Sequence, residues 1–232
     1  MKINIEWNEE TYNKFLNYLK SIGDEKTKEF NKKICTTSYE MLGIKMKVLK
    51  EIAKDISKTN YKKFLANTTS IYYEEVFIEG FVISSIKDPN EFLEYFNRFI
   101  YKIDCWALCD SSIASFKIFK KGDYSSLAYS LILDSREYIV RVGYIILLDY
   151  YIDKEHIKDI LNICTKESSY YYVNMAIAWL LSCCYVKFKD ETLKLLEKKE
   201  LTPFVQNKTI SKIRDSYKVS KEEKELINKY KI

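Results

Sequence analysis

The stretch KMKVLKEIAKDI, residues 45–56, decides the fold class of this chain. Its apolar residues recur at intervals of three and four, which is the period of an amphipathic helix. They are Met46, Leu49, Ile52, Ala53 and Ile56. The 232 residues include only 5 glycines and 2 prolines, whereas sheet-rich folds need many tight turns. The sequence therefore predicts an all-α protein.

Local signals predict where the other helices begin and end. Asp88-Pro89 is a helix start, Ser220 with Glu223 forms a capping box, and Lys121-Gly122 stops a helix. The run 170–173 could be a strand, but the Ala-rich residues after it favour a helix. We expect helices at 8–20, 26–34, 45–56, 60–67, 72–86, 89–99, 104–119, 124–133, 136–151, 155–164, 170–185, 189–198, 203–217 and 221–230.

No stretch rich in Ser, Gly or Pro divides the chain, so we expect one domain over residues 1–232. Antiparallel pairs of such short helices span roughly 35–40 residues, the length of one helix-pair repeat. The predicted architecture is an α-solenoid of HEAT-like helix pairs. A solenoid of this kind curves and binds an extended ligand on its concave face.

Composition narrows the protein's class. There is no apolar run of about 18 residues, so we expect no membrane span. The start, MKINIEWNEE, lacks the blocks of a signal peptide, so a cytoplasmic protein is expected. The six cysteines form no CxxC motif, and His156 is the single histidine. We expect buried reduced thiols and no metal site.

The net charge of +5 is concentrated near the C-terminus. Residues 187–232 hold 13 Lys/Arg and 8 Asp/Glu, whereas residues 1–186 hold 25 of each. Lys208, Lys212 and Arg214 are the expected focus of this surplus. Two interpretations stay open, a basic stripe that binds nucleic acid and a solvated Lys-rich helix.

Four chemically distinctive residues recur at the length of one helix-pair repeat. Trp106 and Asp110 lie one helical turn apart, Arg141 follows Trp106 by 35 residues, and Trp179 follows Arg141 by 38. Stacked repeats would bring them onto one wall. Two indoles, a carboxylate and a guanidinium suit a cationic sugar beside a phosphate backbone. Taken singly, each has an ordinary interpretation: solvent-facing for Asp110, core for either Trp, and a structural ion pair for Arg141.

Four segments together resemble a known family. They are IDCWALCDSS (103–112), EYIVRVGYIILLDYYI (137–152), YYVNMAIAWLL (171–181) and NKTISKIRDSYKVSKEEK (207–224). Their order and separations resemble the DNA alkylation repair family of AlkD-like DNA glycosylases. The resemblance extends over most of the chain, from about residue 39 onward. The resemblance implies a HEAT-like solenoid that grips duplex DNA and excises cationic N3- or N7-alkylated purines without base flipping.

The resemblance also implies roles for particular residues. Asp110 matches the family's catalytic Asp, Trp106 and Trp179 its cleft indoles, and Arg141 its cleft Arg. No cofactor or metal is implied, the expected partner is double-stranded DNA carrying alkylated bases, and a monomer is expected. Two alternatives remain at this level: a relative that binds bent or branched DNA without excision, and a protein-interaction solenoid.

Overall fold

The computed structural model describes residues 6–232, and these form helices with no named strand. The only bridge within this range is an isolated one between Glu40 and Tyr72. The α-helices are α1 Glu9–Ser21, α2 Glu25–Ile34, α3 Met46–Ile56, α4 Tyr61–Ala66, α5 Tyr73–Ile83, α6 Pro89–Phe99, α7 Trp106–Ile113, α8 Ser125–Ile132, α9 Glu137–Tyr150, α10 Ile157–Ile163, α11 Tyr171–Lys187, α12 Lys189–Lys198, α13 Pro203–Asp215 and α14 Lys221–Leu226. Short 3-10 helices follow at Ile100–Lys102, Lys117–Lys120 and Ile227–Tyr230. The all-α prediction is confirmed.

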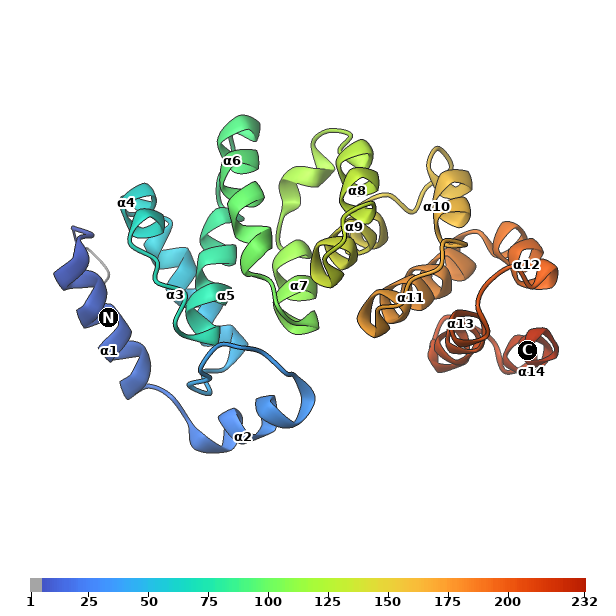
Figure 1. Ribbon diagram of the computed structural model, residues 1–232, viewed down its shortest axis with the longest axis horizontal. Helices are drawn as coiled ribbons and strands as arrows, with labels where there is room; N and C mark the ends of the chain where they lie inside the picture. Colours follow the sequence, from blue (N-terminus) through green and yellow to red (C-terminus); the bar gives the residue numbers. More distant parts are fainter. Residues whose placement is uncertain (1–5) are drawn as a thin grey trace. The chain divides into compact units, whose positions relative to one another are not determined.

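The chain divides into two compact units, each of which is described by itself. Unit 1 is Met1–Lys121 and contains α1 to α7, and unit 2 is Gly122–Ile232 and contains α8 to α14 (Figure 1). Within each unit the helices pack in successive pairs, as predicted for a solenoid. The expectation of one domain over residues 1–232 stays a prediction.

Helix α5 is the centre of unit 1. It packs against α3, α6 and α7, and all eleven of its residues are buried. Three of them are carboxylates, Glu74, Glu75 and Glu79. Because a buried charge is costly without partners, these carboxylates must be bonded internally.

Glu75 ties the loop before α5 to the first helix of the chain. Its carboxylate accepts hydrogen bonds from the Tyr12 hydroxyl at 2.6 Å and from backbone N–H groups of Thr69, Ser70 and Ile71 at 2.6–2.8 Å. Burial acts to raise the pKa of Glu75, but these hydrogen bonds outweigh it and hold the pKa below its ordinary value of 4.5. Glu75 is therefore ionised and structural.

The other two carboxylates of α5 are satisfied in the same way. Glu74 accepts from the N–H groups of Leu42 and Gly43 at 2.9 and 2.7 Å. Glu79 pairs with the Lys102 ammonium at 2.7 Å. Together with Glu75 they fix the loops that precede α3 and α5 and the 3-10 turn that precedes α7.

The helix predicted at 104–119 is wrong in its second half. Helix α7 ends at Ile113, and a 3-10 turn covers Lys117–Lys120. Between them, Phe116 leaves the helical conformation and enters a ring cluster with Phe92 and Phe96, with centroids 5.2 and 5.9 Å away. Burying a large ring in this cluster outweighs the continuation of a helix.

Gly80 lets α6 and α7 pack closely on α5. A Cβ at this position would lie 2.7 Å from Phe99 and 2.8 Å from the Ser112 hydroxyl of α7. No side chain fits there without a shift. The distance between α5 and α7 therefore depends on the absence of a side chain at residue 80.

Unit 2 is built around the row α9, α11 and α13. Helix α11 packs against α9, α12 and α13, and α9 also packs against α8 (Figure 1). Gly143 on α9 permits the close approach of α8, since a Cβ there would lie 2.6 Å from the Ala128 carbonyl oxygen. This row carries every unit 2 residue of the predicted site.

Three further observations concern residues 6–232. No helix in this range is long and apolar enough to cross a membrane. No group of three or more His, Cys, Asp or Glu in the range could hold a metal ion. The six cysteines are free thiols, of which Cys183 is partly exposed and the other five are buried.

Candidate nucleic-acid interface

Helix α7 presents the predicted tryptophan and carboxylate of unit 1. Trp106 is its first residue, Asp110 follows one turn later, and both side chains are partly exposed. The Trp106 ring N–H donates to the Ile34 carbonyl at 3.0 Å, which fixes the indole against the end of α2. Neither residue is sealed in the core, so both can meet a ligand.

Hydrogen bonds to Asp104 and Lys102 hold the start of α7 in place. Asp104 accepts from the Thr37 hydroxyl at 2.7 Å and from the Ser38 N–H at 2.6 Å. The Tyr39 hydroxyl donates to the Lys102 carbonyl at 2.7 Å. Because these bonds clamp residues 37–39 onto the N-terminal end of α7, the helix that carries Asp110 has a fixed position in unit 1.

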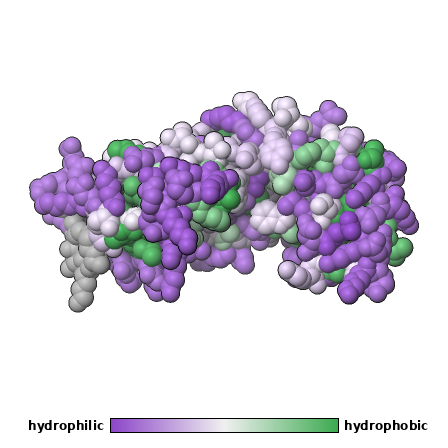
Figure 2. Space-filling model, turned by 90° about the horizontal axis from the view of Figure 1, so that it is seen from below, coloured by the Kyte–Doolittle hydropathy of each residue, from purple (hydrophilic) through white to green (hydrophobic). Residues whose placement is uncertain are grey.

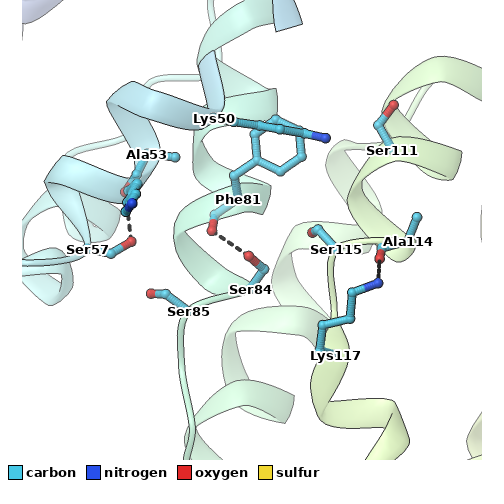
Figure 3. A pocket seen from close by; sticks show the side chains of 11 residues that line it. Lys50, Ala53, Ser57, Phe81, Ser84, Ser85, Ser111, Ala114, Ser115 and Lys117 are labelled. Carbon is cyan, nitrogen blue, oxygen red and sulfur yellow. Dashed lines mark hydrogen bonds between the residues drawn. The ribbon is translucent and has the colours of Figure 1, made fainter. Parts of the chain in front are cut away.

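A basic cavity of about 480 Å³ lies along α3, α5 and α7 in unit 1 (Figure 3). Its lining has three lysines, Lys50, Lys54 and Lys117, and no carboxylate. Lys50 reaches across the ring of Phe81, 5.5 Å from its centroid. Ser111 of α7, the residue next to Asp110, also lines it. Cations and hydroxyls without acids are suited to bind an anion such as phosphate.

Sequence reasoning missed this cavity, although a signal was present. Lys50, Lys54 and Ser57 follow one another at helical spacing on the polar side of the stretch 45–56. The apolar stripe of the same stretch predicts only that a helix forms. A basic face on an amphipathic helix is also the commonest solvated surface, so the pattern alone could not single it out.

Arg141 of α9 is the most buried charge of unit 2. Its side chain is only 4% exposed, and its guanidinium donates to the Tyr172 carbonyl of α11. The ordinary interpretation of Arg141 from the sequence is a structural ion pair. In the structure, the backbone carbonyl of Tyr172 is one of its partners. Because a guanidinium stays protonated, Arg141 supplies a fixed positive charge on α9.

Lys208 and Lys212 lie one turn apart on α13, near Arg141 and Trp179. The Lys212 ammonium is 6.0 Å from the centre of the Trp179 ring. Burial, followed by the charges of Lys208 and Arg141, lowers the pKa of Lys212. Three cations thus lie close enough for Lys208 and Arg141 to act on the charge of Lys212, and Asp215 opposes their effect in part.

Arg214 lies apart from this cluster. Its guanidinium is 4.0 Å from the Glu225 carboxylate of α14, and it points away from the side of α13 that carries Lys208 and Lys212. The three basic residues expected to act together are therefore split in two. Only Lys208 and Lys212 belong to the cationic cluster.

Trp179 lines an open cavity of about 450 Å³ between α9, α11 and α13. Lys187 and Lys212 are among its cations, and Asp215 is its one carboxylate. Cys183 lines it as well, with a thiol whose pKa burial raises. Over the face seen in Figure 2, hydrophilic side chains dominate each unit and apolar residues form small separate spots. The indole is a partly exposed ring in a cavity that both apolar and charged side chains line.

The structure thus groups the predicted residues within each unit. Trp106 and Asp110 share α7 in unit 1, and Arg141, Trp179, Lys208 and Lys212 lie together in unit 2. The catalytic and DNA-binding roles assigned to them stay predictions at this point.

Comparison with known proteins adds the family. No curated protein matches the sequence. The profile of a family described as "DNA alkylation repair enzyme" matches residues 15–213, which include α7, α9, α11 and nearly all of α13. Since this match covers most of the chain and every residue of the cluster, the chain belongs to the DNA alkylation repair enzyme family.

Proposed function

We propose that this protein is a monofunctional DNA glycosylase that removes cationic N3- or N7-alkylated purines from duplex DNA without base flipping. The proposal is supported above all by the cluster of Arg141, Lys208 and Lys212 beside the partly exposed ring of Trp179. A family whose members repair alkylated DNA needs such a surface for the phosphate backbone. Double-stranded DNA is accordingly the proposed partner.

The chemistry follows from the charge of the lesion. Alkylation at N3 or N7 makes the purine a cationic leaving group, so cleavage of its bond to C1′ releases a neutral base and leaves the positive charge on the sugar. A carboxylate beside the sugar stabilises this oxocarbenium-like state more than the ground state. Asp110 takes this role, and water adds to C1′ with loss of a proton.

The indoles and the cations bind the rest of the nucleotide. The ring faces of Trp106 and Trp179 contact the sugar, where each contact with developing positive charge contributes about 0.5–2 kcal/mol. Lys208 and Lys212, which are partly exposed, bind backbone phosphates. Arg141 is too buried to reach far, so it holds the phosphate position through its fixed charge.

The test is release of methylated purine from duplex DNA treated with a methylating agent. Asp110→Asn should lower the rate of excision by at least about tenfold, which is 1.4 kcal/mol in barrier. Asp190→Asn, on an exposed carboxylate of α12, is the matched control and should leave the rate unchanged. Unaltered release by Asp110→Asn, with the helical circular dichroism intact, would refute the proposed role.

One alternative is favoured by a specific observation. A protein that binds DNA without excising bases would also need cations such as Lys208 and Lys212, which unit 2 places one helical turn apart. The same assay separates the two functions, because the non-catalytic protein would bind duplex DNA in a salt-dependent way and release no base.

A further inference from the structure

Four aromatic rings form a continuous strip at the N-terminal ends of α9, α11 and α13. The strip consists of Tyr138, Tyr172, Tyr171 and Phe204. Successive ring centroids are 5.9 Å apart for Tyr138 and Tyr172, 5.2 Å for Tyr172 and Tyr171, and 5.7 Å for Tyr171 and Phe204. Each neighbouring pair is thus in ring contact.

This strip is open to solvent. Tyr171 is 55% exposed and Phe204 is 39% exposed, and the other two rings are partly exposed. Large rings stabilise a fold mainly when they are buried, and Tyr171 and Phe204 each leave part of the ring exposed to solvent. Several exposed rings that touch one another on neighbouring helices form an apolar patch of the kind that binds a ligand.

Cations border the strip on two of these helices, α9 and α13. The Lys208 ammonium lies 6.0 Å from the centre of the Phe204 ring, one turn along α13. Arg141 donates to the backbone carbonyl of Tyr172, directly beneath the strip. The Glu137 carboxylate accepts from the Tyr172 N–H at 2.9 Å and is engaged there. The ligand of this patch should therefore combine a flat apolar group with a negative charge.

We propose that the aromatic strip is a stacking site for unpaired nucleobases of DNA, with the adjoining phosphates bound by Lys208 and Lys212. A nucleotide meets both requirements, because its base offers a flat face and its phosphate a negative charge one sugar away. Tyr171 and Phe204 are the two rings with enough exposed face to stack. The proposal rests on the proposed DNA-binding role of the cations of unit 2, and not on excision by Asp110.

In a duplex, stacking on the neighbouring base pairs hides the faces of the bases. Only a strand that is locally open, frayed or single can place a base on Tyr171 or Phe204. Stacking on an aromatic side chain contributes about 1–3 kcal/mol per base and tolerates any sequence. The strip should therefore give the protein a preference for DNA with unpaired bases over DNA that offers only phosphates.

The experiment compares two single strands of equal charge on the full-length protein. One is an oligothymidylate of about 12 nucleotides, and the other is an abasic deoxyribose-phosphate strand of the same length. Fluorescence anisotropy gives both Kd values at one salt concentration. We expect the protein to bind the strand with bases about tenfold more tightly, since this corresponds to one or two stacked bases.

Substitutions then locate the stacking. Tyr171→Ala with Phe204→Ala should bring the ratio of the two Kd values close to one and leave binding of the abasic strand unchanged. The conservative pair Tyr171→Phe with Phe204→Tyr should keep the ratio. Tyr217→Ala, which removes a fully exposed ring just beyond α13, is the matched control and should also keep it. Lys208→Gln should weaken both strands alike and preserve the ratio.

The proposal is overturned if the wild-type ratio is near one, or if the alanine pair leaves it unchanged or weakens both strands equally. Since Tyr171 is 55% and Phe204 39% exposed, the alanine pair should keep its fold, and circular dichroism at the assay temperature checks this. Failure is distinguishable from failure of the proposed function. Excision of methylpurine that continues with a ratio near one rejects the stacking site alone.

Discussion

Units 1 and 2 use charged residues inside apolar helices for opposite purposes. Helix α5 buries Glu74, Glu75 and Glu79 and bonds each of them to loops or to Lys102, so its charges hold unit 1 together. In unit 2, burial and then the charges of Lys208 and Arg141 lower the pKa of Lys212, and we propose that these cations bind DNA. Charges within helices thus hold unit 1 together and are proposed to form a binding site in unit 2.

Removal of the strongest clamp should have the largest effect. Glu75→Gln replaces a carboxylate with an amide that accepts at one oxygen and turns an NH₂ group toward existing donors. We expect a loss of about 3 kcal/mol in the free energy of unfolding, measured by urea denaturation. Glu10→Gln, on an exposed carboxylate of α1, is the control and should change little. A small effect at Glu75 would remove the distinction between the units.

Acid should act on the same clamp. The folded-state pKa of Glu75 lies below 4.5, so its stabilising contribution is complete above the unfolded-state value and is lost as the pH falls through the folded-state value. Thermal melting below pH 4.5 should therefore show a smaller drop in Glu75→Gln than in the wild type. Equal drops in both proteins would contradict the assignment of the clamp.

The cations of unit 2 should be dispensable for folding and needed for DNA. Lys208→Gln with Lys212→Gln should weaken duplex binding for all sequences alike. The dependence of log K on log salt should flatten by about 0.9 for each lost phosphate contact. Arg214→Gln is the matched control, because Arg214 faces Glu225 on another side of α13. An unaltered salt slope in the double variant would place the phosphates elsewhere.

The smallest effect should be a gain. In Lys212→Met the charge that Lys208 and Arg141 repel is gone, while the aliphatic stem beside Trp179 is kept. Since the folded-state pKa of Lys212 is depressed, its charge opposes folding at pH 7 and less so as the pH rises through that value. The melting temperature should rise slightly at pH 7 as DNA affinity falls. A fall in both would indicate that Lys212 supports the fold.

Much of the fold could be predicted from the sequence, because helical period and capping residues are local signals. The start at Asp88-Pro89 and the box at Ser220 and Glu223 are both present as expected. The error at 104–119 arose because Phe116 joins rings from another helix, and no local pattern reports that contact. Helix type follows from nearby residues, whereas helix length also depends on distant ones.

The candidate site was less predictable for the same reason. Arg141 stands out in the sequence because a charge interrupts an apolar run, yet YEEVFIEGFVI, residues 73–83, has three such charges that are structural. Nothing in the sequence separates the two cases. The separation of Arg214 from Lys212 was readable, since two residues along a helix turn a side chain by about 200°.

The close packing at Gly80 makes the position of α7 sensitive to any side chain placed there. Even a single methyl group there would press on the Ser112 hydroxyl, and Ser112 lies two residues from Asp110 on α7. Side chains of increasing size at position 80 would therefore displace α7, and Asp110 with it, by increasing amounts. Such substitutions would shift the position of the Asp110 carboxylate without changing any residue of α7.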